Sequence, residues 1–202
     1  MSVIAIAFVL LLALILVLAL SWYNVLVRGR NQVREAWSGI EVQLRRRASL
    51  IPNIVEAVRA YAQHERQTFD EVTRARSALQ QAASTAETSA ANHALGQALG
   101  RLLVVAENYP ELRASDNFRH LQQELSDTEE KISFARQFYN RNALDYNNRI
   151  DVFPTLLVAR LFNFGAVEFF DADEEGMAEV RVSFGPEKAA PERSPVPPAP
   201  SS

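Results

Sequence analysis

The sequence predicts an all-α protein with a transmembrane helix at its N-terminus, an antiparallel helical bundle after it and a disordered, proline-rich C-terminal tail. Three observations predict this class. Val3 to Leu20 is an unbroken run of 18 apolar residues. The chain has seven glycines, and no β-branched alternation is sustained between residues 28 and 153, so long stretches lack helix breakers. Six of the nine prolines lie in residues 185–202, a composition that cannot bury enough apolar surface to fold.

The apolar run is long enough to cross a bilayer, because an α-helix rises about 1.5 Å per residue. Trp22 and Tyr23 follow the run where interfacial aromatic rings are favoured, and Arg28, Arg30 and Arg34 come next. We predict that these five residues line the membrane interface, with the N-terminus outside and the bundle in the cytoplasm of a bacterial inner membrane. A cleaved secretory signal is the alternative. Against it, the basic n-region is missing and the run exceeds the usual ~7–15 residues.

Composition excludes several classes of site. The chain contains no cysteine, which excludes disulfides, thiolate zinc sites, iron–sulfur clusters, a cysteine nucleophile and a bacterial lipoprotein anchor. The net charge of -3 argues against a nucleic-acid partner, which normally requires a basic excess. The charge is also uneven, because arginines gather near the membrane and carboxylates toward the C-terminal end.

The first helical block is predicted over residues 24–83. Apolar residues recur in it at spacings of three, four and seven, which is typical of one buried face of a bundle helix. Pro52 interrupts the block, because its ring clashes with the carbonyl of Ala48 and it has no N–H to donate. The stripe keeps its phase across Pro52, which favours a bent helix. Ser49 could instead cap a new helix after a turn, and the residues leave both readings open.

Two further helical blocks are predicted, at Ser89–Asn108 and Ser115–Ile150. The block at Ser115–Ile150 carries apolar residues from Phe118 to Phe138 on one face. Residues 80–91 are predicted to form an exposed connection between helices. A short helix is expected from Thr155 onward, then an acidic segment with a short strand at 179–184. The predicted domains are therefore the anchor (1–27), the bundle (28–165), the acidic segment (166–185) and the tail (186–202).

The search for catalytic chemistry finds no constellation that a reaction would need. The three histidines, His64, His93 and His120, fall in separate blocks. His64-Glu65 begins like a zinc-protease motif, but Thr68 stands where the second histidine belongs. The Glu107 carboxylate is predicted to form a hydrogen bond with the neighbouring turn. We therefore predict no catalytic residue, no metal, no cofactor and no small-molecule substrate.

Two sets of residues indicate contacts rather than catalysis. The triplet Arg45-Arg46-Arg47 lies about 25–30 Å along the helix from the interface, so we expect it to pair with carboxylates in the bundle rather than with lipid. Tyr139-Asn140, Tyr146-Asn147 and Phe153-Pro154 recur every seven residues, which keeps them on nearly one helix face. The simpler interpretation is that these residues pack inside the bundle. The alternative hypothesis is that they form a docking site for another protein, with the candidate residues Tyr139, Asn140, Tyr146, Asn147 and Phe153.

An ordered series of motifs gives the chain a close resemblance to the bacterial LemA family, over about residues 23–170. A serine at position 49, where the family usually has aspartate, is one departure. The motifs include Tyr23-Asn24-x-Leu26-Val27, Ala36-Trp37-Ser38-x-Ile40, Leu50-Ile51-Pro52-Asn53-Ile54-Val55, Tyr61-Ala62-x-His64-Glu65, Glu107-Asn108-Tyr109-Pro110-Glu111-Leu112, Asn117-Phe118, Tyr139-Asn140, Tyr146-Asn147 and Phe153-Pro154.

The resemblance implies a single-pass membrane protein with four antiparallel helices, which favours a turn near Pro52. It supplies no activity, although relatives in magnetosome-forming bacteria are linked to membrane formation. We therefore expect a non-enzymatic scaffold or adaptor, with the lipid bilayer and either a second copy or another membrane protein as partners. The alternative is a lipid-binding, membrane-remodelling protein that acts through its juxtamembrane arginines.

Overall fold

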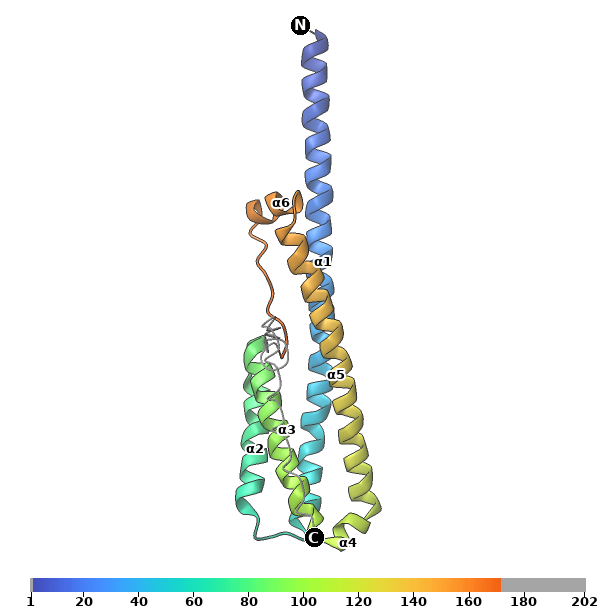
Figure 1. The fold of residues 1–202 in the computed structure, drawn as a ribbon, viewed down its shortest axis with the longest axis vertical. Helices are drawn as coiled ribbons and strands as arrows, with labels where there is room; N and C mark the ends of the chain where they lie inside the picture. Colours follow the sequence, from blue (N-terminus) through green and yellow to red (C-terminus); the bar gives the residue numbers. More distant parts are fainter. Residues whose placement is uncertain (1, 172–202) are drawn as a thin grey trace, which may run out of the picture. The chain divides into compact units, whose positions relative to one another are not determined.

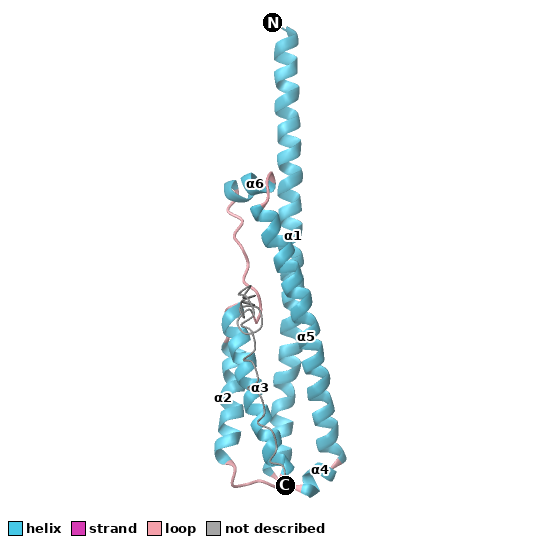
Figure 2. Ribbon diagram, in the orientation of Figure 1, coloured by secondary structure: helices cyan, strands magenta, loops and turns pink. Residues whose placement is uncertain are grey.

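The computed structural model describes residues 2–171, with side chains from Val3 onward. These residues form six α-helices and no strand, which confirms the all-α class (Figure 1, Figure 2). The predicted strand at 179–184, most of the acidic segment and the tail lie outside the described residues. The helices are α1 (Ser2–Arg59), α2 (Arg66–Gln81), α3 (Thr85–Glu107), α4 (Pro110–Ala114), α5 (Asp116–Asp151) and α6 (Thr155–Leu161).

Helix α1 is one helix of 58 residues. Its first third carries the apolar run, whose large side chains are exposed, and Figure 1 shows no other helix beside it. It is the one helix in the described part of the chain that is long and apolar enough to cross a membrane, by length and composition. From Leu26 onward the same helix buries one stripe, which includes Val33, Ile40 and Leu44. Helix α1 therefore has two parts: the apolar run, which contacts no other helix, and the part from Leu26 onward, which buries one face in the bundle.

Of the two possibilities left open at Pro52, the turn that the family resemblance favours is wrong, because α1 continues through this proline to Arg59. Pro52 is exposed, while Ile51 and Ile54 on either side of it are buried. The buried stripe therefore passes the proline without losing its phase. Packing of that stripe holds the helix together where the proline removes one backbone hydrogen bond.

The first predicted block is wrong in its length, because the chain turns between Arg59 and Arg66. Backbone N–H groups of Tyr61 and Ala62 both donate to the carbonyl of Val58, at 3.0 and 2.9 Å, and close the helix end. Ala62 and, beyond the turn, Phe69 are both buried in the core. The turn contains neither glycine nor proline, so local sequence carries no breaker, and burial of both stripes in one core reverses the chain.

Helices α2 and α3 form an antiparallel pair joined by residues 82–84, so the connection predicted over 80–91 exists but is much shorter than predicted. Ser84 caps α3, with its Oγ accepting from the N–H of Glu87 at 3.1 Å. The Glu87 carboxylate accepts in turn from the N–H of Ala83 at 2.9 Å. This reciprocal arrangement starts a helix within a segment rich in alanine, serine and threonine. The five-residue α4 was not predicted, since it is too short to show a helical period.

Helix α5 packs antiparallel along α1, and α1 also contacts α2 and α3 (Figure 1). The side chains of Phe118, Leu121, Leu125 and Ile132 recur at helical spacing and are buried. The ring centroids of Trp37 and Tyr139 lie 5.4 Å apart, which fixes the register of α1 against α5. The bundle therefore consists of the latter part of α1 with α2, α3 and α5.

Helix α6 begins at Thr155, as predicted, and buries Val158 and Ala159. It contacts both α1 and α5. Asn163 ends the helix with φ of 57°, a left-handed conformation that asparagine tolerates. The chain then runs back beside α5 as far as Asp171 (Figure 1), and this return segment includes the buried Phe164 and Phe170.

Candidate functional site

The structure does not bring together the histidines and the glutamate that were considered from the sequence as possible catalytic groups. His64 lies in the turn after α1, His93 on α3 and His120 on α5, and all three side chains are exposed. Glu107 is exposed at the end of α3. Within residues 2–171, no group of three or more His, Asp or Glu side chains is placed to hold a metal ion.

The arginine triplet pairs with carboxylates, as predicted. Arg45 contacts Glu41 one turn earlier at 2.9 Å, and this pair is exposed. Arg46 reaches Glu124 of α5 at 2.7 Å. Both bonds lie at the surface, where an ion pair contributes little free energy of folding.

Arg47 differs from its neighbours because its side chain is buried. One terminal nitrogen, Nη1, lies 2.8 Å from Oδ1 of Asn92 on α3 and 2.7 Å from a carboxylate oxygen of Glu129 on α5. Burial lowers the pKa of the Arg47 guanidinium, and the charge of Glu129 partly offsets this. A single arginine thus connects three helices of the bundle.

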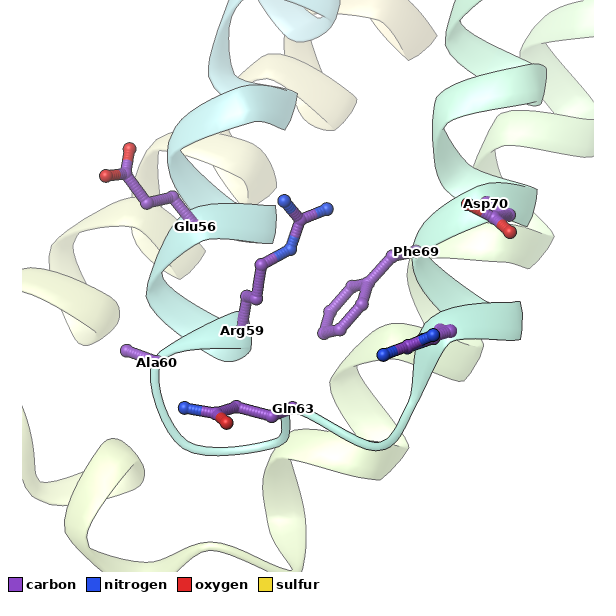
Figure 3. A pocket seen from close by; sticks show the side chains of 7 residues that line it. Glu56, Arg59, Ala60, Gln63, Phe69 and Asp70 are labelled. Atoms are coloured by element: carbon purple, nitrogen blue, oxygen red, sulfur yellow. The ribbon is translucent and has the colours of Figure 1, made fainter.

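A hollow lies at the end of the bundle away from the apolar run. It has a volume of about 570 Å³ and is open to solvent. Figure 3 shows Arg59 extending from the end of α1 toward the ring of Phe69 on α2, with the guanidinium carbon 5.2 Å from the ring centroid. Glu56, Asp70 and Arg66 also line it, so its charges balance and favour no ionic ligand. About 58 Å of helix separates Arg59 from Leu20.

Three of the four residues in the repeated Tyr-Asn pairs of α5, namely Tyr139, Asn140 and Asn147, contact the chain's own return segment. Tyr139 and Tyr146 are buried, and the Tyr139 hydroxyl donates to the carbonyl of Glu168 at 2.7 Å. Burial raises the pKa of both tyrosines, with Arg30 and Arg34 opposing this at Tyr146. Phe153, by contrast, is exposed. Of the predicted strip, therefore, only Phe153 has its side chain turned to the outside.

Asn140 and Asn147 hold the return segment through both of their amide atoms. Asn147 donates to the carbonyl of Val167 and accepts from its N–H, each at 2.9 Å. Asn140 does the same with Phe170, also at 2.9 Å. Seven helical residues rise about 10.5 Å and three extended residues span about 10 Å, so the two spacings match. We call these two asparagines with residues 167–170 the asparagine latch.

The predicted membrane-interface residues follow the exposed part of α1. Trp22 and Tyr23 are half-buried, and Tyr23 meets the rings of Phe162 and Phe164 edge-on, with centroids 4.9 and 5.7 Å away. The guanidinium of Arg30 lies 5.0 Å from the Phe164 centroid, a cation–π distance. Arg28 and Arg34 are exposed. Tyr23 and Arg30 thus bind the α6 region to α1.

Sequence reasoning missed two exposed apolar surfaces. Phe138 was assigned to the buried face of α5, but it is exposed together with Phe134, one turn earlier. The spacing from the buried Ile132 and Tyr139 places both rings on the opposite side of the helix. The second surface is the outer face of α6 and its flanks. The sequence pattern that could have identified this surface is the apolar spacing of Phe153, Leu157 and Leu161, which occur at every fourth residue.

The fold and these contacts define a class of protein: an all-α bundle continuous with one helix long and apolar enough to cross a membrane. The chain belongs to the LemA family, whose model matches residues 36–184. It is similar to protein LemA of Metamycoplasma hominis, with 28% identity over 79% of this chain and 74% of that protein.

The chain is also similar to two magnetosome proteins. It is 26% identical to magnetosome protein MamQ of Magnetospirillum gryphiswaldense and 27% identical to magnetosome protein MamQ 2 of Paramagnetospirillum magneticum. Each match covers 76% of this chain and spans 66% of the relative's length. These relatives extend beyond the region that they share with this chain.

Proposed function

We propose that this protein is a non-enzymatic, membrane-anchored scaffold that holds a membrane-associated protein at a set distance from the bilayer. The observation that carries the proposal is the continuity of α1, which runs without a break from the apolar run through the whole bundle. A continuous helix transmits position and orientation, whereas a flexible linker would not. We place the anchor in the bacterial inner membrane with the bundle on the cytoplasmic side, because the arginines follow the run.

The exposed rings of Phe134 and Phe138 are the surface that we assign to the partner. They lie one turn apart on the outer side of α5, near the level of Tyr139. Since Tyr139 meets Trp37, this level is about 25 Å along α1 from Leu20. A partner there must itself be close to the bilayer, and a second copy of the chain or another membrane protein satisfies this.

Cysteine crosslinking in native membranes tests the scaffold, and the absence of native cysteine gives a clean background. Phe134→Cys is expected to yield a covalent adduct of higher mass with a maleimide crosslinker, and Phe138→Ser in the same chain to abolish it. Val104→Cys, exposed on α3, is the matched control and should yield monomer. Monomer alone from every variant would contradict the scaffold.

The absence of catalysis has its own test. Two of the groups with shifted pKa values have structural partners: Arg47 pairs with Glu129, and the Tyr139 hydroxyl donates to a backbone carbonyl. This supports structural rather than catalytic roles for them. A hydrolase activity of the purified protein that disappeared with His64→Ala or Glu107→Gln would overturn the proposal. Topology is checked separately, because protease added to spheroplasts should spare a cytoplasmic bundle.

Lipid binding through arginines is the second candidate function. Arg28 and Arg34 are exposed on α1 within about 21 Å of Leu20, and each arginine near an anionic surface contributes about 1 kcal/mol. Replacing Arg28, Arg30 and Arg34 with glutamine should weaken binding to anionic liposomes if this function holds. Unchanged binding would remove it.

A further inference from the structure

The short helix α6 presents an apolar face that no described residue covers. Its inner side chains, Val158 and Ala159, are buried. On the outer side Phe153 is 73% exposed and Leu161 is 78% exposed. Apolar patches of this kind on a folded surface mark an interaction site. The full set of exposed large apolar side chains on α6 and its flanks is Val152, Phe153, Leu157, Leu161 and Phe162.

The position of this face along α1 is set by aromatic contacts. Tyr23 meets Phe162 at 4.9 Å between ring centroids, and Tyr23 follows Leu20 by about 4.5 Å of helix axis. Figure 1 places α6 beside α1 where the part of α1 without neighbours begins. The exposed apolar surface of the run therefore continues onto the outer face of α6, at the depth where a bilayer's headgroups meet its acyl chains.

The charges around α6 fit the same depth. Residues 152–162 include Arg160 and no acidic residue. Arg160, Arg149 at the end of α5 and Arg28 on α1 are all exposed, and Asp151 directly precedes the segment in the sequence. Arginine buries its methylene stem against apolar groups while its guanidinium reaches headgroup phosphates. A soluble protein partner is a poorer fit, because the apolar residues 3–20 that adjoin this face are long enough to cross a bilayer.

We infer that residues 152–162, which we call the α6 wedge, insert into the interface of the leaflet on the bundle side, as a second membrane contact beside the spanning helix. The inference rests on the proposed anchoring of α1. With two attachments, the bundle could neither rotate about α1 nor tilt freely. The side chains of Leu157 and Leu161 would lie among acyl chains, and Arg160 would lie at the phosphates.

Depth-dependent quenching of a fluorophore on full-length protein tests the wedge. A single cysteine carrying an NBD label is placed at Leu157 in nanodiscs of phosphatidylcholine and phosphatidylglycerol. Val104→Cys is the matched control, since Leu157 and Val104 are 59% and 61% exposed, and Leu11→Cys reports the spanning segment. The label at Leu157 should be quenched several-fold more by nitroxide-bearing lipid, and several-fold less by aqueous iodide, than the label at Val104.

The possible outcomes separate the wedge from the anchor. If the Leu157 label behaves like the Val104 label while the Leu11 label is quenched by lipid, the wedge is wrong and the anchoring stands. If the Leu157 label is shielded from both quenchers, a protein covers α6 and the lipid assignment is wrong. If iodide reaches the Leu11 label, both the anchoring and the wedge fail.

A charge substitution gives a second readout. With Leu157→Glu and Leu161→Glu, the lipid quenching of a label at Phe153→Cys should fall to the level at Val104. The helical circular dichroism of the bundle should be retained, because both positions are exposed. Unchanged lipid quenching in this variant would also overturn the wedge.

Discussion

Arg76 of α2 donates from its Nε to the backbone carbonyl of Ala48 on α1, at 3.0 Å. In a regular helix this carbonyl would accept from the N–H of residue 52, and Pro52 has none. The side chain of one helix therefore replaces the hydrogen bond that a proline removes from another. The contact explains how α1 continues through Pro52 and also joins α2 to α1 at that point.

A double-mutant cycle should reveal this replacement. Arg76→Ala leaves the Ala48 carbonyl without its donor and should lower the free energy of unfolding by about 1–2 kcal/mol. In a Pro52→Ala background, where an N–H returns, the same change should cost much less. Urea unfolding in detergent micelles, followed by circular dichroism, measures both. Arg74→Ala is the control, since its Nε bonds the carbonyl of Asp70 within α2. Equal costs of Arg76→Ala in the two backgrounds would refute the replacement.

The asparagine latch should open when an amide donor is lost. Asn140→Asp keeps the shape of the side chain but turns a carboxylate oxygen toward the Phe170 carbonyl, which repels it. The backbone N–H of Phe170 should then exchange with solvent about tenfold faster or more, given about 1–3 kcal/mol for an unmade buried bond. Hydrogen exchange measures this residue by residue. Asn148→Asp, exposed on the same helix, should leave Phe170 unchanged, and protection of Phe170 in both variants would count against the latch.

Arg47 should matter more to stability than Arg45. Arg47→Met retains apolar bulk but leaves Oδ1 of Asn92 without its donor, so unfolding should become easier by about 1–3 kcal/mol. Glu129 is 55% exposed at its side chain and returns to water at little cost. Arg45→Ala removes an exposed pair and should change stability by less than about 1 kcal/mol. Equal effects of the two changes in urea unfolding would mean that Arg47 does not connect the helices.

Stability should fall in alkaline solution because of the buried tyrosines. Burial raises the pKa of Tyr139 and Tyr146 above the ordinary value of 10.0, so the unfolded chain loses these protons first. Their contribution is complete below pH 10 and is lost as pH rises from there through the folded pKa, at up to about 1.4 kcal/mol per pH unit for each group. Urea unfolding at several pH values should show a shallower decline for Tyr146→Phe and an unchanged one for the exposed Tyr61→Phe.

Much of the fold was readable from local pattern. The buried positions of α5 recur at helical spacing, and Pro154 before Thr155 indicated the start of α6. The pairing of the arginine triplet with carboxylates was also predicted, because the triplet lies about 25–30 Å along the helix from the membrane interface. The candidate site was harder. The seven-residue repeat of Tyr139-Asn140 and Tyr146-Asn147 identified the right residues, but their partner is an extended segment twenty to thirty residues away.

The apolar run, the helical class and the stripes that form the core can all be recognised from local sequence, because each depends on the spacing of side chains along one helix. Where the chain reverses, and which groups most of its polar side chains bind, depends on contacts between helices. The turn at Ala60–Glu65 contains no breaker, and the proline at position 52 causes no turn. The turn at residues 60–65 forms because the apolar stripes of α1 and α2 are buried in one core. Helix α1 continues through Pro52 because Arg76 of α2 donates a hydrogen bond to the Ala48 carbonyl. Such contacts depend on distances between helices, which no local spacing records.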